Sequence, residues 1–134
     1  MDYRLISLKK INDERGQLIF GESSREIPFE IKRFYCIIDA PANSRRGFHA
    51  HKNLKQCLIC LKGNCDIIID DGKNRRTISL AKPDDGLIIE GEVWRELHNF
   101  SHDCVLLVLA DEFYDPDDYI HDYPEFIRRK NGKK

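Results

Sequence analysis

The chain has 134 residues, and its 22 Lys and Arg against 23 Asp and Glu give a formal net charge of −1. This balance gives no overall attraction to nucleic acid or anionic lipid, and 41% hydrophobic with 34% charged residues is typical of a folded globular protein. No apolar stretch approaches the roughly 18 residues that a membrane helix needs, and because the chain is charged from Asp2 onward we expect no signal peptide. We therefore expect one cytoplasmic domain over residues 1–134, with no nucleic acid and no membrane as partner.

Short apolar runs separated by turn signals follow one another along the chain. The predicted strands cover residues 31–39, 56–61, 65–69, 76–80, 87–90 and 104–110. Strand signals at intervals of about 8 to 12 residues predict an all-β sandwich or barrel. In the tail, Pro116 stands at a first helical position, and Tyr119, Tyr123, Phe126 and Ile127 follow at helical spacing. A short C-terminal helix that covers the barrel is expected there.

Five cysteines raise a redox or zinc question, because Cys57 and Cys60 form a C-x-x-C pair; the others are Cys36, Cys65 and Cys104. The pair lies inside a predicted strand, where positions three apart point to opposite faces. No second C-x-x-C accompanies it. We expect buried, reduced cysteines with a structural role.

The densest group of reactive side chains is the segment 45–52, Arg-Arg-Gly-Phe-His-Ala-His-Lys. In a strand, His49 and His51 share one face with their Cβ atoms about 7 Å apart, and Phe48 and Ala50 face the other way. Two imidazoles on one face form either half of a metal site or an acid/base pair. Histidines in a barrel can also be purely structural.

The spacing of His49, His51 and Gln56 resembles the first motif of the cupin superfamily, which implies an RmlC-like jelly-roll barrel. The family's usual metal ligands include an acidic residue and a last histidine, and Gln56 and Trp94 stand at those two positions here. A neutral amide is a poor substitute for a carboxylate, and an indole nitrogen is only a donor. We therefore expect no metal and no cofactor.

The string R-G-F-H-A-H-K at residues 46–52, with the segments 70–72, 93–95 and 99–101, is similar to the nucleotide-sugar 3,4-ketoisomerases. These are the metal-free WxcM-like branch of the cupins, and the similarity runs from residue 13 to residue 119. It implies conversion of dTDP-4-keto-6-deoxy-D-glucose to a dTDP-3-keto-6-deoxyhexose through an enediol, for deoxyaminosugars of surface glycans such as lipopolysaccharide or S-layer glycan. His49 is the implied base and His51 its acid/base partner or shuttle. Tyr35 would orient or protonate the sugar oxygens, or be a structural barrel tyrosine.

The same resemblance implies a set of substrate-binding residues: Arg15, Arg33, Arg46, Lys52, Gln56, Trp94 and Arg95. Arginines pair bidentately with phosphate, so Arg46, with Arg45 or Arg33, is expected on the diphosphate. Trp94 and Arg95 are expected at the mouth of the barrel. Arg15 resembles the branch that forms galacto products and Arg95 the branch that forms gluco products, with galacto slightly favoured. A homodimer with exchanged N-terminal strands is also implied.

A related alternative is a 3,5-epimerase, which shares the barrel and the substrate but has motifs that fit this chain less well. Two other classes of function also stay open. One is a metal-dependent cupin enzyme that uses His49 and His51 with His98 or His102. The other is a non-catalytic cupin that binds a nucleotide-sugar or a protein. Without such roles, His98, His102 and His121 are expected to be solvent exposed.

Overall fold

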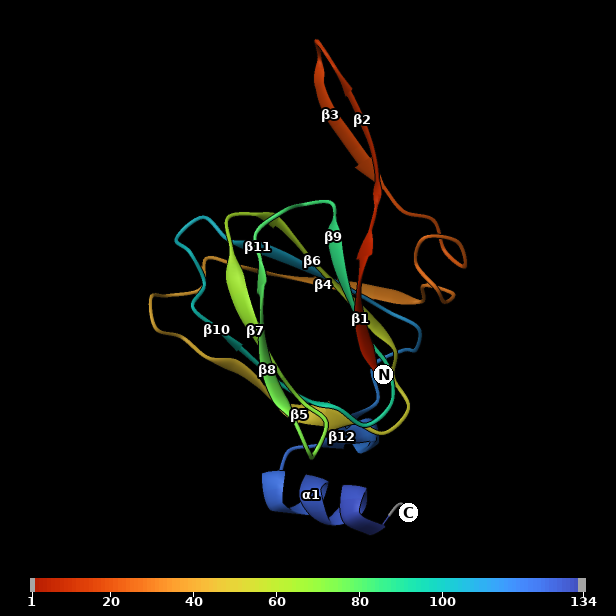
Figure 1. The fold of residues 1–134 in the computed structure, drawn as a ribbon, viewed down its shortest axis with the longest axis vertical. Helices are drawn as coiled ribbons and strands as arrows, with labels where there is room; N and C mark the ends of the chain where they lie inside the picture. The colour runs from red at the N-terminus through yellow and green to blue at the C-terminus, as the bar shows by residue number, and fades with distance from the viewer. Residues whose placement is uncertain (1, 133–134) are drawn as a thin grey trace.

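The computed structural model describes residues 2–132, which form two five-stranded antiparallel sheets facing each other, a separate hairpin and one C-terminal helix (Figure 1). The first sheet has the order β1-β9-β6-β11-β4, with β1 at Tyr3–Ser7, β9 at Asp85–Ile89, β6 at Gln56–Lys62, β11 at Val105–Ala110 and β4 at Arg33–Ile38. The second has the order β12-β5-β10-β7-β8, with β12 at Tyr119–Ile120, β5 at Arg46–His51, β10 at Trp94–His98, β7 at Cys65–Asp70 and β8 at Arg75–Leu80. The predicted all-β barrel is confirmed.

Each of the six predicted strands is present, with bounds that differ by one or two residues at some ends. Alternation places one side of each strand in the core between the sheets, where Leu58, Ile67, Leu87 and Leu106 are almost fully buried. The tight turn between β6 and β7 needs Gly63, whose φ is +71° and where a Cβ would meet the Ser101 hydroxyl oxygen at 2.2 Å.

The outer faces of the two sheets are covered by different parts of the chain. The loop between β3 and β4 brings Ile27 and Phe29 onto the outer face of the first sheet, against Cys57 and Ile88. The helix α1 (Tyr123–Gly132) covers the outer face of the second sheet (Figure 1). The first sheet is therefore covered on both faces around β6 and β9, and the second sheet around β5, β10 and β12.

The helix begins later than the sequence suggested. Pro116–Asp118 is a 3-10 turn whose Asp115 side chain accepts a hydrogen bond from the Asp117 backbone, and Tyr119–Ile120 then pairs with β5 as the strand β12. Only from Tyr123 on does the chain coil into α1, which buries Phe126. The expectation that Tyr119 belongs to the helix is wrong, because pairing with β5 satisfies its backbone instead.

A hairpin of β2 (Lys9–Asp13) and β3 (Gly16–Phe20) projects beyond the barrel (Figure 1). Its apolar residues are unusually exposed, with Ile11 at 54% and Leu18 at 56%. Within residues 2–132, no helix is long and apolar enough to cross a membrane.

The cysteines are free, as expected, and four of them are buried. Cys57 faces the outer cluster and Cys60 the core between the sheets, so the C-x-x-C pair is split between two faces. Cys36 is exposed on the edge strand β4, which corrects the expectation that every cysteine is buried.

Candidate active site

A cavity of about 310 Å³ opens between the two sheets at one end of the barrel. Its polar lining consists of three arginines, three tyrosines, one histidine and one glutamine: Arg33, Arg46, Arg95, Tyr35, Tyr114, Tyr119, His49 and Gln56. Six of these were predicted as site residues from the sequence. Their strands β4, β5, β6 and β10 lie in both sheets, so folding brings them together.

The histidine pair lies on β5 as predicted, on one face of the strand. The imidazole rings of His49 and His51 meet edge to face with their centroids 4.8 Å apart. The strand carries a β-bulge beside them, because Arg95 pairs with His49 while the next residue of β10 pairs with Gly47. Gly47 and Phe48 both have positive φ, +84° and +58°. Bulges commonly re-aim side chains next to functional sites, and this one directs His49 into the cavity.

His51 is fully buried behind His49 and is held by Asp118. The distance from His51 Nδ1 to Asp118 Oδ2 is 2.9 Å, and the other carboxylate oxygen accepts the Asn53 backbone N–H at 2.8 Å. Because a carboxylate can only accept, Nδ1 carries the proton and Nε2 is left with a free lone pair. Nε2 is buried and has no hydrogen-bond partner among the described residues. His51 is thus fixed in orientation and tautomer.

Burial keeps both imidazoles neutral. Desolvation, with the Arg95 guanidinium, lowers the pKa of His49 from 6.5 to about 4. The pKa of His51 is also lowered, first by burial and then by Arg95 and His49. A neutral imidazole facing a cavity can accept a proton, so His49 has the protonation state of a base at neutral pH.

Arg95 places a buried positive charge in the cavity. Its side chain donates to Gln56 Oε1 at 2.5 Å and to the Val93 carbonyl oxygen at 3.0 and 3.2 Å. Gln56 in turn donates to the Tyr35 hydroxyl at 3.4 Å. None of the ion pairs within residues 2–132 supplies a carboxylate to Arg95. Burial lowers the pKa of this guanidinium to about 10, so it remains charged and available to an anion.

The C-terminal segment supplies residues that sequence reasoning missed. The Tyr119 ring lies 4.4 Å from the His51 ring and 5.0 Å from the His49 ring, centroid to centroid, and stacks on His121. Asp118 contacts His51 across 67 residues of sequence. Asp118 and Tyr119 were not predicted as site residues because this segment was assigned to a helix outside the barrel, although the family resemblance extended to residue 119.

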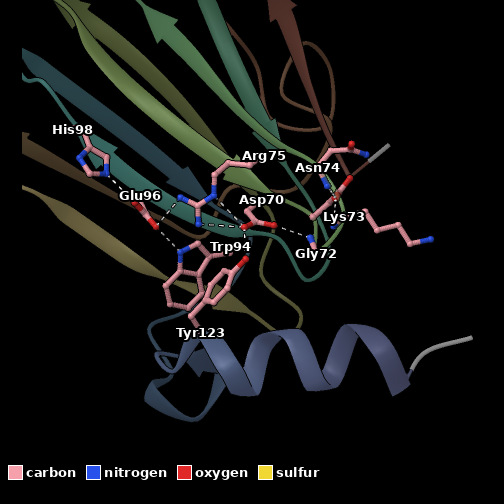
Figure 2. Close-up of polar contacts among 10 residues, drawn as sticks. Asp70, Gly72, Lys73, Asn74, Arg75, Trp94, Glu96, His98 and Tyr123 are labelled. Carbon is pink, nitrogen blue, oxygen red and sulfur yellow. Dashed lines mark hydrogen bonds and ion pairs between the residues drawn. The ribbon is translucent and has the colours of Figure 1, made fainter.

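Trp94 is not at the mouth of the barrel, which corrects the prediction. Alternation along β10 turns Arg95 into the cavity and Trp94 to the outer face, where its ring packs 5.9 Å from Phe126 of α1. Figure 2 shows the polar contacts of this outer face, in which Glu96 accepts from the Trp94 indole at 3.0 Å and contacts His98 at 2.9 Å. His98 is therefore part-buried and not exposed as expected.

Two other predicted site residues lie outside the cavity of this chain. Lys52 is exposed just after β5, and its backbone N–H donates to the Asp118 carbonyl oxygen. Arg15 is exposed on the projecting hairpin, where it pairs with Asp13 at 2.7 Å. A role for either in binding stays a prediction that depends on a ligand or partner reaching it.

A metal site made by the histidine pair with His98 or His102 is wrong for this fold. His98 points to the outer face toward Glu96, and His102 borders a separate hollow with Phe100. Neither reaches the face that holds His49 and His51. His121, exposed as expected, lies 5.9 Å from His49 between ring centroids.

The fold and the cavity define a small cupin-type barrel with a histidine pair and a buried arginine in its interior. Residues 1–131 match the model of the family described as WxcM-like, C-terminal (FdtA), and the chain belongs to this family.

Three relatives illustrate the similarity. A TDP-4-oxo-6-deoxy-alpha-D-glucose-3,4-oxoisomerase from Aneurinibacillus thermoaerophilus is 48% identical over 126 residues, which are 94% of this chain and 91% of that protein. The solved TDP-quinovose 3,4-ketoisomerase WlaRB from Campylobacter jejuni is 52% identical, with a TM-score of 0.91 over 95% of this chain and 98% of that one. A histidine-to-asparagine mutant of the 3,4-ketoisomerase QdtA from Thermoanaerobacterium thermosaccharolyticum, solved with TDP-4-keto-6-deoxyglucose, is 41% identical, with a TM-score of 0.96 over 98% and 96%.

Proposed function

We propose that the protein is a sugar-nucleotide 3,4-ketoisomerase that converts TDP-4-keto-6-deoxyglucose to the corresponding 3-keto sugar. The family and its named relatives support the substrate class. The observation that carries the proposal is a neutral imidazole, His49, facing a cavity beside the buried charge of Arg95. Moving a ketone by one carbon needs this combination of a base and a stabilised oxyanion.

In the proposed reaction His49 removes the C3 proton, which is acidic because it is α to the C4 ketone. The electron pair of the C–H bond forms a C3–C4 double bond, and negative charge develops on the C4 oxygen. Arg95 stabilises that charge, since a preorganised cation in a dry site costs no reorganisation as the charge develops. His49 then returns the proton to C4, and the ketone forms at C3.

The hydroxyl proton must also move, from the C3 oxygen to the C4 oxygen. Tyr35 is assigned this transfer, because its hydroxyl lines the cavity and is held by the amide of Gln56. His51 lies behind His49 and not in the cavity lining, so its role is that of a proton shuttle or a support for the His49 ring. Asp118 acts through His51 as a positioning residue.

The nucleotide end of the substrate is assigned to the arginines near the cavity mouth. Arg46 is exposed at the start of β5, and Arg33 borders both the cavity and a second hollow of about 480 Å³. Tyr114 lines both spaces as well, and its ring lies 5.8 Å from the Arg33 guanidinium. Guanidinium groups suit a diphosphate, and the flanking aromatic ring suits a stacked base.

The face on which C4 is protonated decides the product. In a D-gluco ring the C3–H and the C4–H lie on opposite faces, whereas a galacto C4–H lies on the same face as the C3–H. Because His49 returns the proton to the face from which it removed it, we propose the galacto product that the sequence slightly favours. The solved relatives include both kinds, because one from Campylobacter jejuni is named for quinovose, which is 6-deoxyglucose, and another is named for fucose, which is 6-deoxygalactose. A 3-keto product suits a following amine-transfer reaction that makes an aminosugar for a surface glycan.

Proton NMR of TDP-4-keto-6-deoxyglucose in D₂O, with chelator and a catalytic amount of protein, tests the proposal. We expect the C3 proton signal to disappear and a 3-keto species to form, with couplings that report the C4 configuration. His49→Asn should abolish both while TDP still binds, and His102→Asn, an exposed residue outside the cavity, is the matched control. Full exchange of the C3 proton for deuterium in His49→Asn, or isomerase activity that requires added metal, would contradict the mechanism. TDP binding without exchange in the unaltered protein would instead indicate a binding module.

A further inference from the structure

Three buried cysteines meet in the interior of the barrel, away from the histidines. Cys60, Cys65 and Cys104 are 1%, 1% and 3% exposed, and their sulfur atoms all lie within 4.8 Å of one another. Within residues 2–132 this is the one group of three His, Cys, Asp or Glu side chains that could ligate a single ion. The proposed isomerase chemistry uses none of them.

The fold itself positions the three sulfurs. Cys60 stands on β6 and Cys104 immediately before β11, which are neighbours in the first sheet, while Cys65 begins β7 of the second sheet. The β6–β7 turn and the loop between β10 and β11 are joined by two hydrogen bonds. The Asn64 carbonyl oxygen accepts the Ser101 N–H at 2.9 Å, and the Ser101 hydroxyl accepts the Asn64 N–H at 2.9 Å. The sulfurs are thus held by paired backbone and not by flexible loops.

The spacing of the sulfurs fits ligation by one ion. Cys60 Sγ and Cys104 Sγ are 3.6 Å apart. A tetrahedral zinc ion with Zn–S bonds of about 2.3 Å separates its sulfurs by about 3.8 Å. A small change in the Cys65 side-chain rotamer would bring its sulfur into position as the third ligand.

We propose that Cys60, Cys65 and Cys104 form a binding site for a soft divalent cation with filled d shell, such as Zn²⁺ or Cd²⁺. Three thiols lose their protons to solvent and three metal–sulfur bonds form, with the fourth position open to a water molecule. Each cysteine stands within two residues of an exposed position: Lys62, Asn64 or Asp103.

The bound ion links the two sheets and does not take part in the isomerisation. Cys60 follows Gln56 by four residues on the same face of β6, which places the cluster about 13 Å from the cavity residue. Its effect is therefore on stability, since an ion that binds only the folded state raises the unfolding temperature.

Titration of the fully reduced protein with Cd²⁺ tests the site, with a phosphine as reductant and the ultraviolet thiolate-to-metal charge-transfer band as readout. We expect one equivalent to bind. Cys60→Ser and Cys104→Ser should weaken binding by more than about tenfold and reduce the band. Cys36→Ser, which changes an exposed cysteine on β4, should leave both unchanged. Equal binding by all variants, or none by the unaltered protein, overturns the proposal.

A measurement on the unaltered protein avoids the risk that a core variant misfolds. Because buried thiols react only when the fold opens, Zn²⁺ should slow the alkylation of Cys60, Cys65 and Cys104 over hours, while Cys36 reacts rapidly with or without the ion, and peptide mass spectrometry identifies the modified residues. The thermal unfolding midpoint should rise with Zn²⁺ and return with chelator. Protection of Cys57 in place of the cluster, or an unchanged midpoint, counts against the site.

Discussion

At the scale of single residues, the site depends on imidazoles that are kept neutral by burial. His49 faces the cavity and is neutral at neutral pH, so it can accept a proton, and Asp118 fixes the tautomer of His51 behind it. Neither feature follows from residue type alone. The same H-x-H pattern in an exposed strand would titrate near its usual pKa and would have no fixed tautomer.

Asp118→Asn tests the positioning role at this scale. An amide can present its NH₂ group to Nδ1, which favours the wrong tautomer of His51. We expect kcat to fall by about 10- to 100-fold with little change in KM, within the range of positioned proton transfer. Asp117→Asn is the matched control, because Asp117 is the exposed neighbour in the same turn. An unchanged kcat, or a rise in KM alone, would mean that Asp118 has only a structural or binding role.

The lowered pKa of His49 makes stability depend on pH. Between pH 6.5 and about 4 the unfolded state binds a proton that folded His49 does not, so the free energy of unfolding falls as pH falls through this window. The full effect is up to about 3 kcal/mol, from about 1.4 kcal/mol per unit of pKa. Urea unfolding across the window should show a shallower pH dependence for His49→Asn than for the unaltered protein. Equal slopes would show that His49 is not buried in its neutral form.

At the scale of elements, the bulge in β5 determines where the catalytic strand points. A Cβ at Gly47 would meet Leu97 Cδ1 at 2.8 Å and the Arg95 carbonyl oxygen at 3.0 Å, at a φ of +84°. Gly47→Ala should therefore lower the free energy of unfolding by about 1–3 kcal/mol and lower kcat as His49 shifts. Gly72→Ala, at a φ of +96° in the turn between β7 and β8 and outside the cavity, controls for backbone strain. Equal activity loss in both variants would refute a specific role of the bulge.

The strands could be predicted from alternation, but their partners could not. An apolar run such as residues 56–61 predicts a strand regardless of which strand it pairs with. The spacing of His49 and His51 likewise predicts that both side chains lie on one face of their strand. The predicted position of Trp94 was wrong because the sequence of β10 does not show which of its alternating residues face the cavity and which face outward. Asp118 was missed because its contact with His51 exists only after β12 pairs with β5.

At the scale of the whole molecule, the projecting hairpin exposes an apolar surface. Ile11 and Leu18 face each other across the β2–β3 pair, and both are more than half exposed. An exposed apolar surface of this kind marks an interaction site, and we propose that exchange of this N-terminal segment builds a homodimer. The exchange would also bring Arg15 toward the site of the other subunit.

Leu18→Glu tests the dimer by placing a charge in the apolar face of the hairpin. We expect sedimentation equilibrium to show a dimer for the unaltered protein and a shift of at least tenfold toward monomer for the variant, because an unpaired buried charge is strongly unfavourable. Gln17→Glu, on the neighbouring exposed position of β3, controls for added charge. A monomer in both cases, or a dimer that Leu18→Glu leaves intact, would exclude the hairpin as the interface.

The contact between Asp118 and His51 also has a consequence for how the chain matures during synthesis. A ribosome delivers β5 long before the segment that pairs with it, since 67 residues separate the two side chains. Until that segment emerges, a nascent barrel can hold His49 and Arg95 but not the carboxylate that orients His51. The active site is therefore completed late in translation. Chains released before residue 118 would be defective enzymes even where most strands of both sheets have formed.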